Sequence, residues 1–189
     1  DQTRRQRQMC IRDSISLSLA AKKNFNDIGM LAAKDYWFDN SFRRNIMKPV
    51  MNLIPIGRRS SEGRDISFDD TLKLSKGFMN VNKRCIIIFP EGTRGEPDVL
   101  IRFKKGPARL AIGTGEKILP AVITGTGLLW PKGKIIFKPG EINVYILPPL
   151  DPNSFLIRDN KNNIDLFKSA EAMTNALETK IKEKIKDLS

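Results

Sequence analysis

The residues best suited to chemistry lie together in one short stretch, Phe89-Pro90-Glu91-Gly92-Thr93-Arg94. It closes the apolar run 85–89, which predicts a turn at the end of a buried strand. In α/β folds, active residues gather where strands end and loops begin. Gly92 permits an unusual backbone dihedral or a close approach to a ligand, and the Arg94 guanidinium suits a phosphate because it forms two parallel hydrogen bonds. The plain alternative is a surface Glu91–Arg94 ion pair, contributing about 0–1 kcal/mol.

The composition excludes several kinds of catalysis. The chain has 189 residues, no histidine, and two cysteines, Cys10 and Cys85, which form no CxxC pair. Zinc sites of the usual kinds and Ser-His-Asp catalysis are therefore excluded for this chain. We expect no metal site and no bound cofactor. The cysteines give no disulfide framework, which favours a reducing compartment.

Strands and helices alternate along the chain, and this order predicts the fold that positions residues 89–94. Strands are expected at 28–33, 52–58, 85–89, 119–124, 134–138 and 142–147, with 85–89 as the central strand. Helices are expected at 14–21 and 42–51, from Ser67 and Lys105 onward, and at 165–188. This alternation predicts an α/β fold: a single domain whose central, largely parallel or mixed sheet is flanked by helices.

The last helix has the clearest pattern. Its apolar residues recur at three- and four-residue steps: Leu166, Ala170, Met173, Leu177, Ile181, Ile185 and Leu188. We expect this stripe to face the core. The opposite face is expected to carry four lysines between 180 and 186, together with Glu178 and Glu183. The sequence therefore predicts a surface helix docked by one stripe, with a membrane-lying amphipathic helix as the alternative.

The charge of the chain favours anionic partners. Net charge is +12 and the pI is near 9.9. Phospholipid head groups, phosphorylated substrates and acidic carrier proteins all fit such a balance, and so does a lysine-rich soluble surface. Nucleic acid is not expected, because zinc-finger spacing and RNP-type aromatic motifs are absent. No apolar run approaches the roughly 20 residues that cross a bilayer, so we expect peripheral or monotopic membrane contact.

Residues 1–14 differ from the rest of the chain. They are polar and rich in arginine, whereas lysine dominates later. The stretch resembles translated sequencing-adapter DNA, which predicts a tail foreign to a domain that covers 15–189. The alternative is a native, basic and disordered arm.

Four segments together resemble the glycerolipid acyltransferase family, which includes 1-acylglycerol-3-phosphate acyltransferases. The hexapeptide 89–94 resembles the third sequence block of that family, and Phe103-Lys104-Lys105-Gly106 resembles the stretch that follows it. Residues 54–58 (Ile-Pro-Ile-Gly-Arg) resemble the second block, and 118–122 (Ile-Leu-Pro-Ala-Val) the fourth. One departure is Gly95, where a serine is common in the family. The resemblance implies a glycerol-phosphate acyltransferase-like fold.

The resemblance also implies an activity. A fatty acyl group would pass from an acyl thioester of CoA or acyl carrier protein to the free hydroxyl of a lysophosphatidic acid-like lipid. This step of phospholipid biosynthesis would take place at the cytoplasmic face of an anionic membrane. In the family's first block, His-x-x-x-x-Asp, the histidine is the general base and the aspartate orients it. Asp13 stands about where the aspartate is expected, but Gln8 stands in place of the histidine. Either the foreign end has overwritten the block, which we prefer, or the chain is an inactive homologue that binds phospholipid or a partner protein.

The resemblance further implies a substrate-binding set that follows the second and third blocks: Arg58, Glu91, Gly92, Thr93, Arg94, Lys104 and Lys105. Arg58 and Arg94 would bind the acceptor phosphate in one shared pocket. Glu91 would bond to the glycerol backbone or hold an arginine in place. The two lysines would add positive potential for the phosphate or for an acidic acyl carrier, unless they form only a solvated basic turn.

Overall fold

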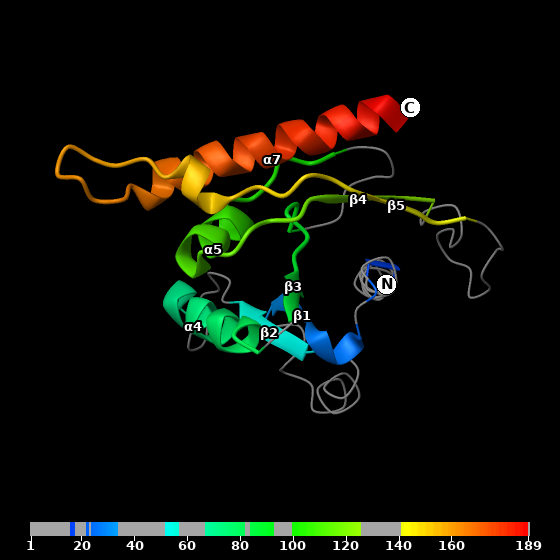
Figure 1. Ribbon diagram of the computed structural model, residues 1–189, viewed down its shortest axis with the longest axis horizontal. Helices are drawn as coiled ribbons and strands as arrows, with labels where there is room; N and C mark the ends of the chain where they lie inside the picture. The colour runs from blue at the N-terminus through cyan, green and yellow to red at the C-terminus, as the bar shows by residue number, and fades with distance from the viewer. Residues whose placement is uncertain are drawn as a thin grey trace. The chain divides into compact units, whose positions relative to one another are not determined.

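The computed structural model describes residues 16–17, 22, 24–33, 52–56, 67–81, 84–92, 100–125 and 141–188 (Figure 1). The chain divides into two compact units. We call Ala21–Ile88 the sheet unit, and Asp1–Ala20 with Phe89–Ser189 the helix unit. Within the described ranges, no helix combines the length and the apolar character needed to span a bilayer.

The sheet unit contains three parallel strands in the order β2-β1-β3. They are β1 (Ile28–Ala33), β2 (Asn52–Ile56) and β3 (Cys85–Ile87). Among the described strands, β1 therefore has a partner on both sides, and the prediction that 85–89 is central was wrong. The side chains of β3 are only half-buried, whereas Ile28, Met30 and Ile54 are buried. Strand order follows from the crossover connections, which the apolar run of one strand does not specify.

Helix α4 (Phe68–Met79) begins as the sequence predicts, with Ser67 as its N-cap. The Ser67 hydroxyl accepts a hydrogen bond from the Asp69 backbone N–H at 3.1 Å. The helix packs against β2 and β3. Its fully buried positions are Thr71 and Ser75, so small polar side chains face the sheet.

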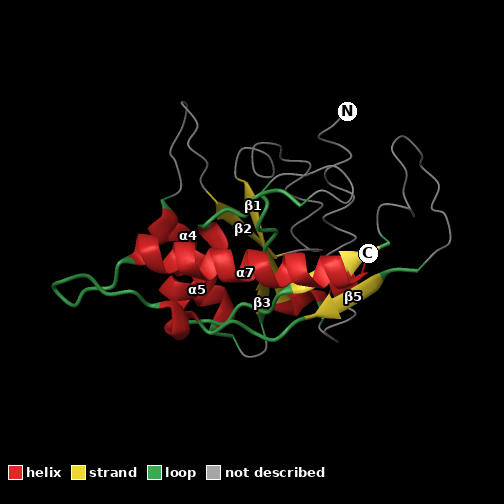
Figure 2. Ribbon diagram, turned by 90° about the horizontal axis from the view of Figure 1, so that it is seen from above, coloured by secondary structure: helices red, strands yellow, loops and turns green. Residues whose placement is uncertain are grey.

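The helix unit is built around helix α7 (Leu166–Leu188). Helix α5 (Gly106–Thr114), strand β4 (Ala121–Thr124) and the short helix η2 (Pro152–Phe155) pack against it (Figures 1 and 2). Strand β5 (Asn143–Ile146) pairs with β4 in antiparallel orientation. Together with the parallel sheet, this pair confirms the α/β class with mixed strand pairing. The core cluster is Phe103, Ala108, Ala111, Val122, Leu150, Ala170, Met173, Leu177 and Ile181.

The stripe predicted for the last helix is confirmed over its middle. Ala170, Met173, Leu177 and Ile181 are buried. Glu178, however, does not lie on the outer face as predicted, because its side chain is only 17% exposed. Two other predictions, the strand at 134–138 and the helix at 42–51, lie outside the described residues. Of the predicted helix at 14–21, only residues 16–17 are described, and both are helical.

Candidate functional site

After β3, the chain makes a tight turn at residues 89–92. The Gly92 backbone N–H donates to the Phe89 carbonyl at 3.1 Å, which closes a four-residue turn. Pro90 occupies the second position, where its fixed φ is favoured. Gly92 has a φ of 61°, a left-handed conformation that glycine adopts at little cost. The sequence thus specifies this turn with two residues.

The segment 100–105 is attached to the turn by hydrogen bonds from two of its backbone N–H groups. The Lys104 N–H donates to the Pro90 carbonyl at 2.9 Å. The Ile101 N–H donates to the Glu91 carboxylate at 3.3 Å. Glu91 is half-buried. Its carboxylate therefore holds the neighbouring segment, a role that the sequence did not predict.

Lys104 lies directly beside Gly92. A Cβ atom placed on Gly92 would come within 2.8 Å of Lys104 Cδ and 3.2 Å of its Nζ. The lysine side chain therefore crosses the turn at the one residue that has no side chain. Lys104 is exposed, and within the described ranges no carboxylate forms an ion pair with it. As far as the described residues go, its ammonium group is therefore open to an anion at the turn.

The Lys105 side chain contacts helix α7 instead of the turn. Its Nζ lies 2.9 Å from Glu171 Oε1 on α7. The same ammonium lies 3.7 Å from the centroid of the Phe167 ring, a cation–π contact. The sequence did not distinguish the two lysines. The structure assigns Lys105 to contacts with α7 and leaves Lys104 at the turn.

A second α7 carboxylate holds the same segment. The Phe103 backbone N–H donates to Glu178 Oε2 at 3.1 Å, and Lys182 Nζ lies 2.5 Å from Glu178 Oε1. These bonds, of which the one from Lys182 has the larger effect, hold the pKa of Glu178 below its ordinary value, so the group is charged at neutral pH.

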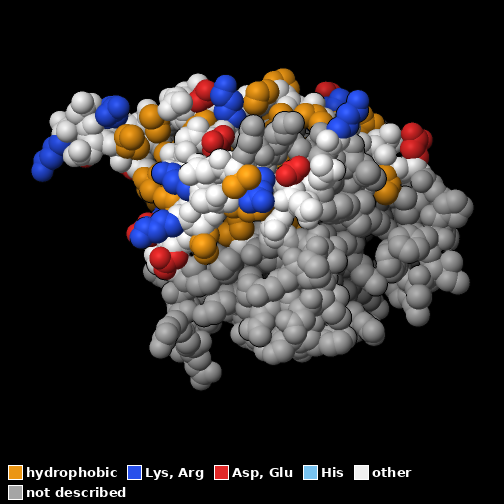
Figure 3. Space-filling model, turned by 60° about the horizontal axis from the view of Figure 1, so that its bottom comes forward, with side chains coloured by type: hydrophobic (Ala, Val, Ile, Leu, Met, Phe, Trp, Pro, Cys, Tyr) orange, Lys and Arg blue, Asp and Glu red, His pale blue; other side chains and the backbone are white. Residues whose placement is uncertain are grey.

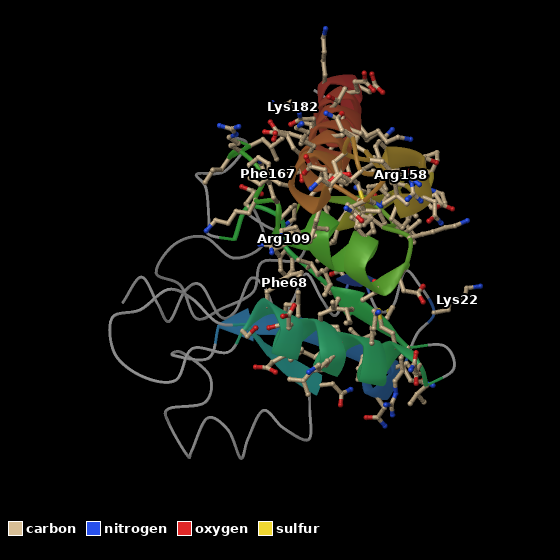
Figure 4. All side chains as sticks on the ribbon, turned by 90° about the vertical axis from the view of Figure 1, so that its left-hand side faces the viewer. Lys22, Phe68, Arg109, Arg158, Phe167 and Lys182 are labelled. Atoms are coloured by element: carbon tan, nitrogen blue, oxygen red, sulfur yellow. The ribbon has the colours of Figure 1, made fainter. Side chains whose placement is uncertain are left out.

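Phe167 and Lys182 lie on the same side of α7 (Figure 4). Glu171 and Glu178 are seven residues apart, which also places them on one face.

Four of the predicted site residues lie together in the helix unit: Glu91, Gly92, Lys104 and Lys105. Asp13, Arg58, Thr93 and Arg94 lie outside the described residues, so the shared phosphate pocket stays a prediction.

Two of the predicted site segments, those that contain Arg58 and Glu91, follow strands of the sheet unit. Strands β2 and β3 flank β1 in parallel. Both therefore run toward the same edge of the sheet, although β2 ends opposite Ala33 and β3 ends opposite Met30. Arg58 follows the last residue of β2 by two positions. The chain that leads to Glu91 leaves the same edge at the end of β3.

The described surface carries charges of both signs. In Figure 3, basic side chains lie among acidic and hydrophobic ones and form no continuous basic area on the described part of that face. Across the described ranges, no group of three or more His, Cys, Asp or Glu residues is arranged to hold a metal ion. The arrangement of Gly92 and Lys104 at the turn is therefore a better indication of an anionic ligand than the distribution of charge on the described surface.

The fold is shared with a known enzyme structure. The crystal structure of the 1-acyl-sn-glycerophosphate (LPA) acyltransferase PlsC from Thermotoga maritima superposes with a TM-score of 0.56 over 86% of this chain and 57% of that chain, at 22% sequence identity. The likeness places this chain in the same α/β fold.

Sequence comparisons identify the family. The family model described as "Acyltransferase" matches residues 8–124, a range that includes Gln8 and Asp13. The 1-acyl-sn-glycerol-3-phosphate acyltransferase of Limnanthes douglasii is 40% identical over 72 residues, which are 38% of this chain and 26% of that protein. The enzyme of the same name from Borreliella burgdorferi is 33% identical over 108 residues, 57% of this chain and 41% of that protein. The chain thus matches less than half the length of these relatives. It belongs to the acyltransferase family, as its sequence blocks predicted.

Proposed function

We propose that this chain carries the acceptor-binding part of an O-acyltransferase that acts on a lysophosphatidic acid-like lipid. The observation that carries the proposal is that the acyltransferase family model spans both the turn at Glu91–Gly92 and the segment with Lys104. Relatives named 1-acyl-sn-glycerol-3-phosphate acyltransferase support this choice of acceptor. The donor would be an acyl thioester of CoA or acyl carrier protein, and no metal is needed.

The proposed reaction makes one ester and breaks one thioester. The free glycerol hydroxyl attacks the thioester carbonyl carbon, a C–O bond forms, and the C–S bond breaks as the thiol leaves. A base must take the hydroxyl proton during the attack. The family resemblance assigns this task to a histidine, and the chain has none. We therefore propose that this chain binds the acceptor without turning it over at a measurable rate.

The acceptor phosphate would bind at the turn. Lys104 supplies an ammonium group beside Gly92, and Arg94 and Arg58 would add guanidinium groups. Gly92 would give the turn its left-handed backbone, and Thr93 would belong to the same substrate-binding set. Glu91 would keep the turn and the Lys104 segment together through its bond to Ile101. Lys105 would contribute potential but no direct contact, because Glu171 already pairs with it.

Calorimetric titration with a short-chain lysophosphatidate, below its critical micelle concentration, tests this binding site. We expect Lys104→Ala to weaken binding by roughly tenfold, because a hydrogen bond to a charged group contributes about 1.5–3 kcal/mol. Lys161→Ala is the matched control, since Lys161 is an exposed lysine in another loop. Equal affinity for a monoacylglycerol with the same acyl chain would refute the phosphate site.

We further propose that the chain works at an anionic membrane surface as a peripheral protein on the cytoplasmic side. The net charge of +12 supports this placement, since basic proteins are attracted to anionic leaflets. Sedimentation with vesicles checks it: binding to phosphatidylglycerol vesicles should exceed binding to phosphatidylcholine vesicles and fall as salt is added. Equal binding to both vesicle types would contradict the proposal.

A second function remains in competition: an inactive homologue that binds phospholipid or a partner protein. The absence of histidine from the whole chain favours it. A homologue that binds phospholipid also predicts lysophosphatidate binding, so binding alone does not separate it from the first function. Restoring a histidine at residue 8 separates them.

A further inference from the structure

Helix α7 holds the segment 100–105, which we call the lysine segment, at two points. Glu178 accepts a hydrogen bond from the Phe103 backbone N–H at 3.1 Å, and Glu171 pairs with the Lys105 ammonium at 2.9 Å. Lys104 lies between these two anchored residues. The turn holds the same segment through the N–H groups of Ile101 and Lys104. The segment is thus tied to the turn and to α7 over a few consecutive residues.

We propose that Glu178 is a positioning residue: by fixing the Phe103 backbone, it sets the place of the Lys104 side chain across Gly92. The inference rests on the proposed function, because it assigns Glu178 to the proposed phosphate site. Glu178 does not itself contact the ligand in this proposal. It acts through the backbone of the residue that precedes Lys104.

The surroundings of Phe103 favour a role for this bond beyond general stability. The Phe103 side chain is already anchored, since it is 5% exposed and belongs to the core cluster. That anchor does not by itself orient the peptide plane that precedes Phe103, and the bond from the Phe103 N–H to Glu178 does. The next peptide plane is held by the bond from the Lys104 N–H to the Pro90 carbonyl. Without Glu178, the Phe103 N–H would have to find water or another acceptor. The backbone at Phe103 could then move relative to α7, and the Lys104 side chain with it, while the core stays intact.

Lys182 has a separate task. It pairs with Glu178 Oε1 from the same helix, whereas Phe103 binds Oε2. Lys182 is 59% exposed, so its pair is solvated and contributes little on its own. The proposal therefore requires the acceptor oxygen that faces Phe103 and does not require the salt bridge. This difference makes the two contributions separable by mutation.

The experiment compares four variants of the full chain: Glu178→Ala, Glu178→Gln, Lys182→Met and Glu183→Ala. Affinity for short-chain lysophosphatidate is measured by calorimetry well below the unfolding temperature, and hydrogen–deuterium exchange is followed in the peptides that cover 89–92 and 100–105. We expect Glu178→Ala to weaken binding by about three- to tenfold and to accelerate exchange at Phe103. Glu178→Gln should retain most of the affinity, because its amide oxygen can still accept from Phe103 N–H.

The remaining variants are controls. Lys182→Met should bind lysophosphatidate within about twofold of the parent chain, because an exposed ion pair contributes little. Glu183→Ala removes an exposed carboxylate from the same helix and should change neither measurement. If Glu178→Ala does not fold, Glu178→Met keeps the length of the side chain without the acceptor oxygen and replaces it.

Two outcomes overturn the proposal. One is a Glu178→Ala variant with unchanged affinity and unchanged exchange at 100–105. The other is a Glu178→Ala variant that melts earlier but, while folded, binds lysophosphatidate as tightly as the parent chain, since this is the result of a purely structural role. If the parent chain does not bind lysophosphatidate, the proposed function fails, and the exchange data alone then decide whether Glu178 fixes the segment.

Discussion

Gly92 and Lys104 are matched to each other in the turn. The lysine carbons Cδ and Cε lie 2.8 and 2.9 Å from where a Cβ on residue 92 would be, so the missing side chain makes room for the neighbouring one. The positive φ of Gly92 adds a second reason for glycine at this position. Sequence reasoning predicted an unusual dihedral or a close approach to a ligand at Gly92; the structure confirms the dihedral and places the Lys104 side chain beside the residue. It did not identify Lys104 as the neighbour, because the two residues are not close in the sequence.

Comparing Gly92→Ala with Gly115→Ala separates these two effects. Gly115 has a φ of 79°, and a Cβ added there would meet no atom within 4 Å, whereas a Cβ on Gly92 would meet the Lys104 side chain. Both substitutions should destabilise the fold by about 1–2 kcal/mol, because left-handed backbone is costly for alanine. Only Gly92→Ala should also weaken lysophosphatidate binding. Thermal unfolding and calorimetric titration measure the two quantities, and equal binding by both variants would contradict a role for the close contact.

Arg94 is predicted to bind the acceptor phosphate with a planar fork. Arg94→Ala should weaken lysophosphatidate binding by roughly tenfold or more, since charge-assisted hydrogen bonds contribute about 1.5–3 kcal/mol each. Arg94→Lys should also bind weakly, because an ammonium group cannot form two parallel bonds. Calorimetric titration checks both variants. A structural Glu91–Arg94 surface pair would instead predict little change in binding or in stability.

At the scale of elements, the local patterns in the sequence were reliable. The three- and four-residue spacing predicted the buried stripe of α7, and Ser67 predicted the start of α4. The two carboxylates that reach the lysine segment were not predicted. Glu178 binds a backbone N–H that lies 75 residues away in sequence, and backbone donors leave no signal in side-chain patterns. The strand order was missed for a similar reason, since it depends on crossovers rather than on apolar runs.

The carboxylate of Glu178 makes the stability of α7 sensitive to acid. Bonds from Lys182 and Phe103 lower the pKa of Glu178 below its ordinary value of 4.5. The unfolded chain therefore binds a proton at this group more readily than the folded chain does. The resulting stabilisation is fully present above about pH 4.5 and is lost as the pH falls through the lower pKa of the folded state.

Replacing Glu178 should flatten this part of the pH profile. The free energy of unfolding of Glu178→Gln should fall less steeply below about pH 4.5 than that of the parent chain. Urea unfolding at a series of pH values provides the measurement. Asp151 and Asp165 also have lowered pKa values, and their shared contribution remains in both proteins. Glu183→Gln should follow the parent curve, and identical slopes for Glu178→Gln and the parent would show that the Glu178 bonds do not persist in solution.

For the whole molecule, the missing base determines the expected activity. We predict no measurable acyl transfer from palmitoyl-CoA to lysophosphatidate, because general-base assistance typically contributes about 10²–10⁴-fold. The assay follows release of the free thiol. Robust turnover by the unchanged chain would show that the reaction here does not depend on a histidine.

Gln8→His then distinguishes the two explanations for the missing base. It restores the His-x-x-x-x-Asp spacing with Asp13 and lies within the range that matches the family. We expect no recovery of turnover, because we interpret residues 1–14 as foreign to the domain. Recovered turnover would show instead that residues 8–13 keep the native register, and that the chain is a homologue inactivated at one position.

The strand order β2-β1-β3 also sets a condition on how the sheet unit forms. Gly29 of β1 pairs with Asn52 and with Ile86, so both contacts join residues far apart in sequence. Contacts of this kind carry a large loop-closure cost and slow folding. During synthesis, β1 remains without its second partner until β3 has left the ribosome. A nascent chain that stops before Cys85 would therefore expose one edge of β1, and an unpaired strand edge is a site for aggregation.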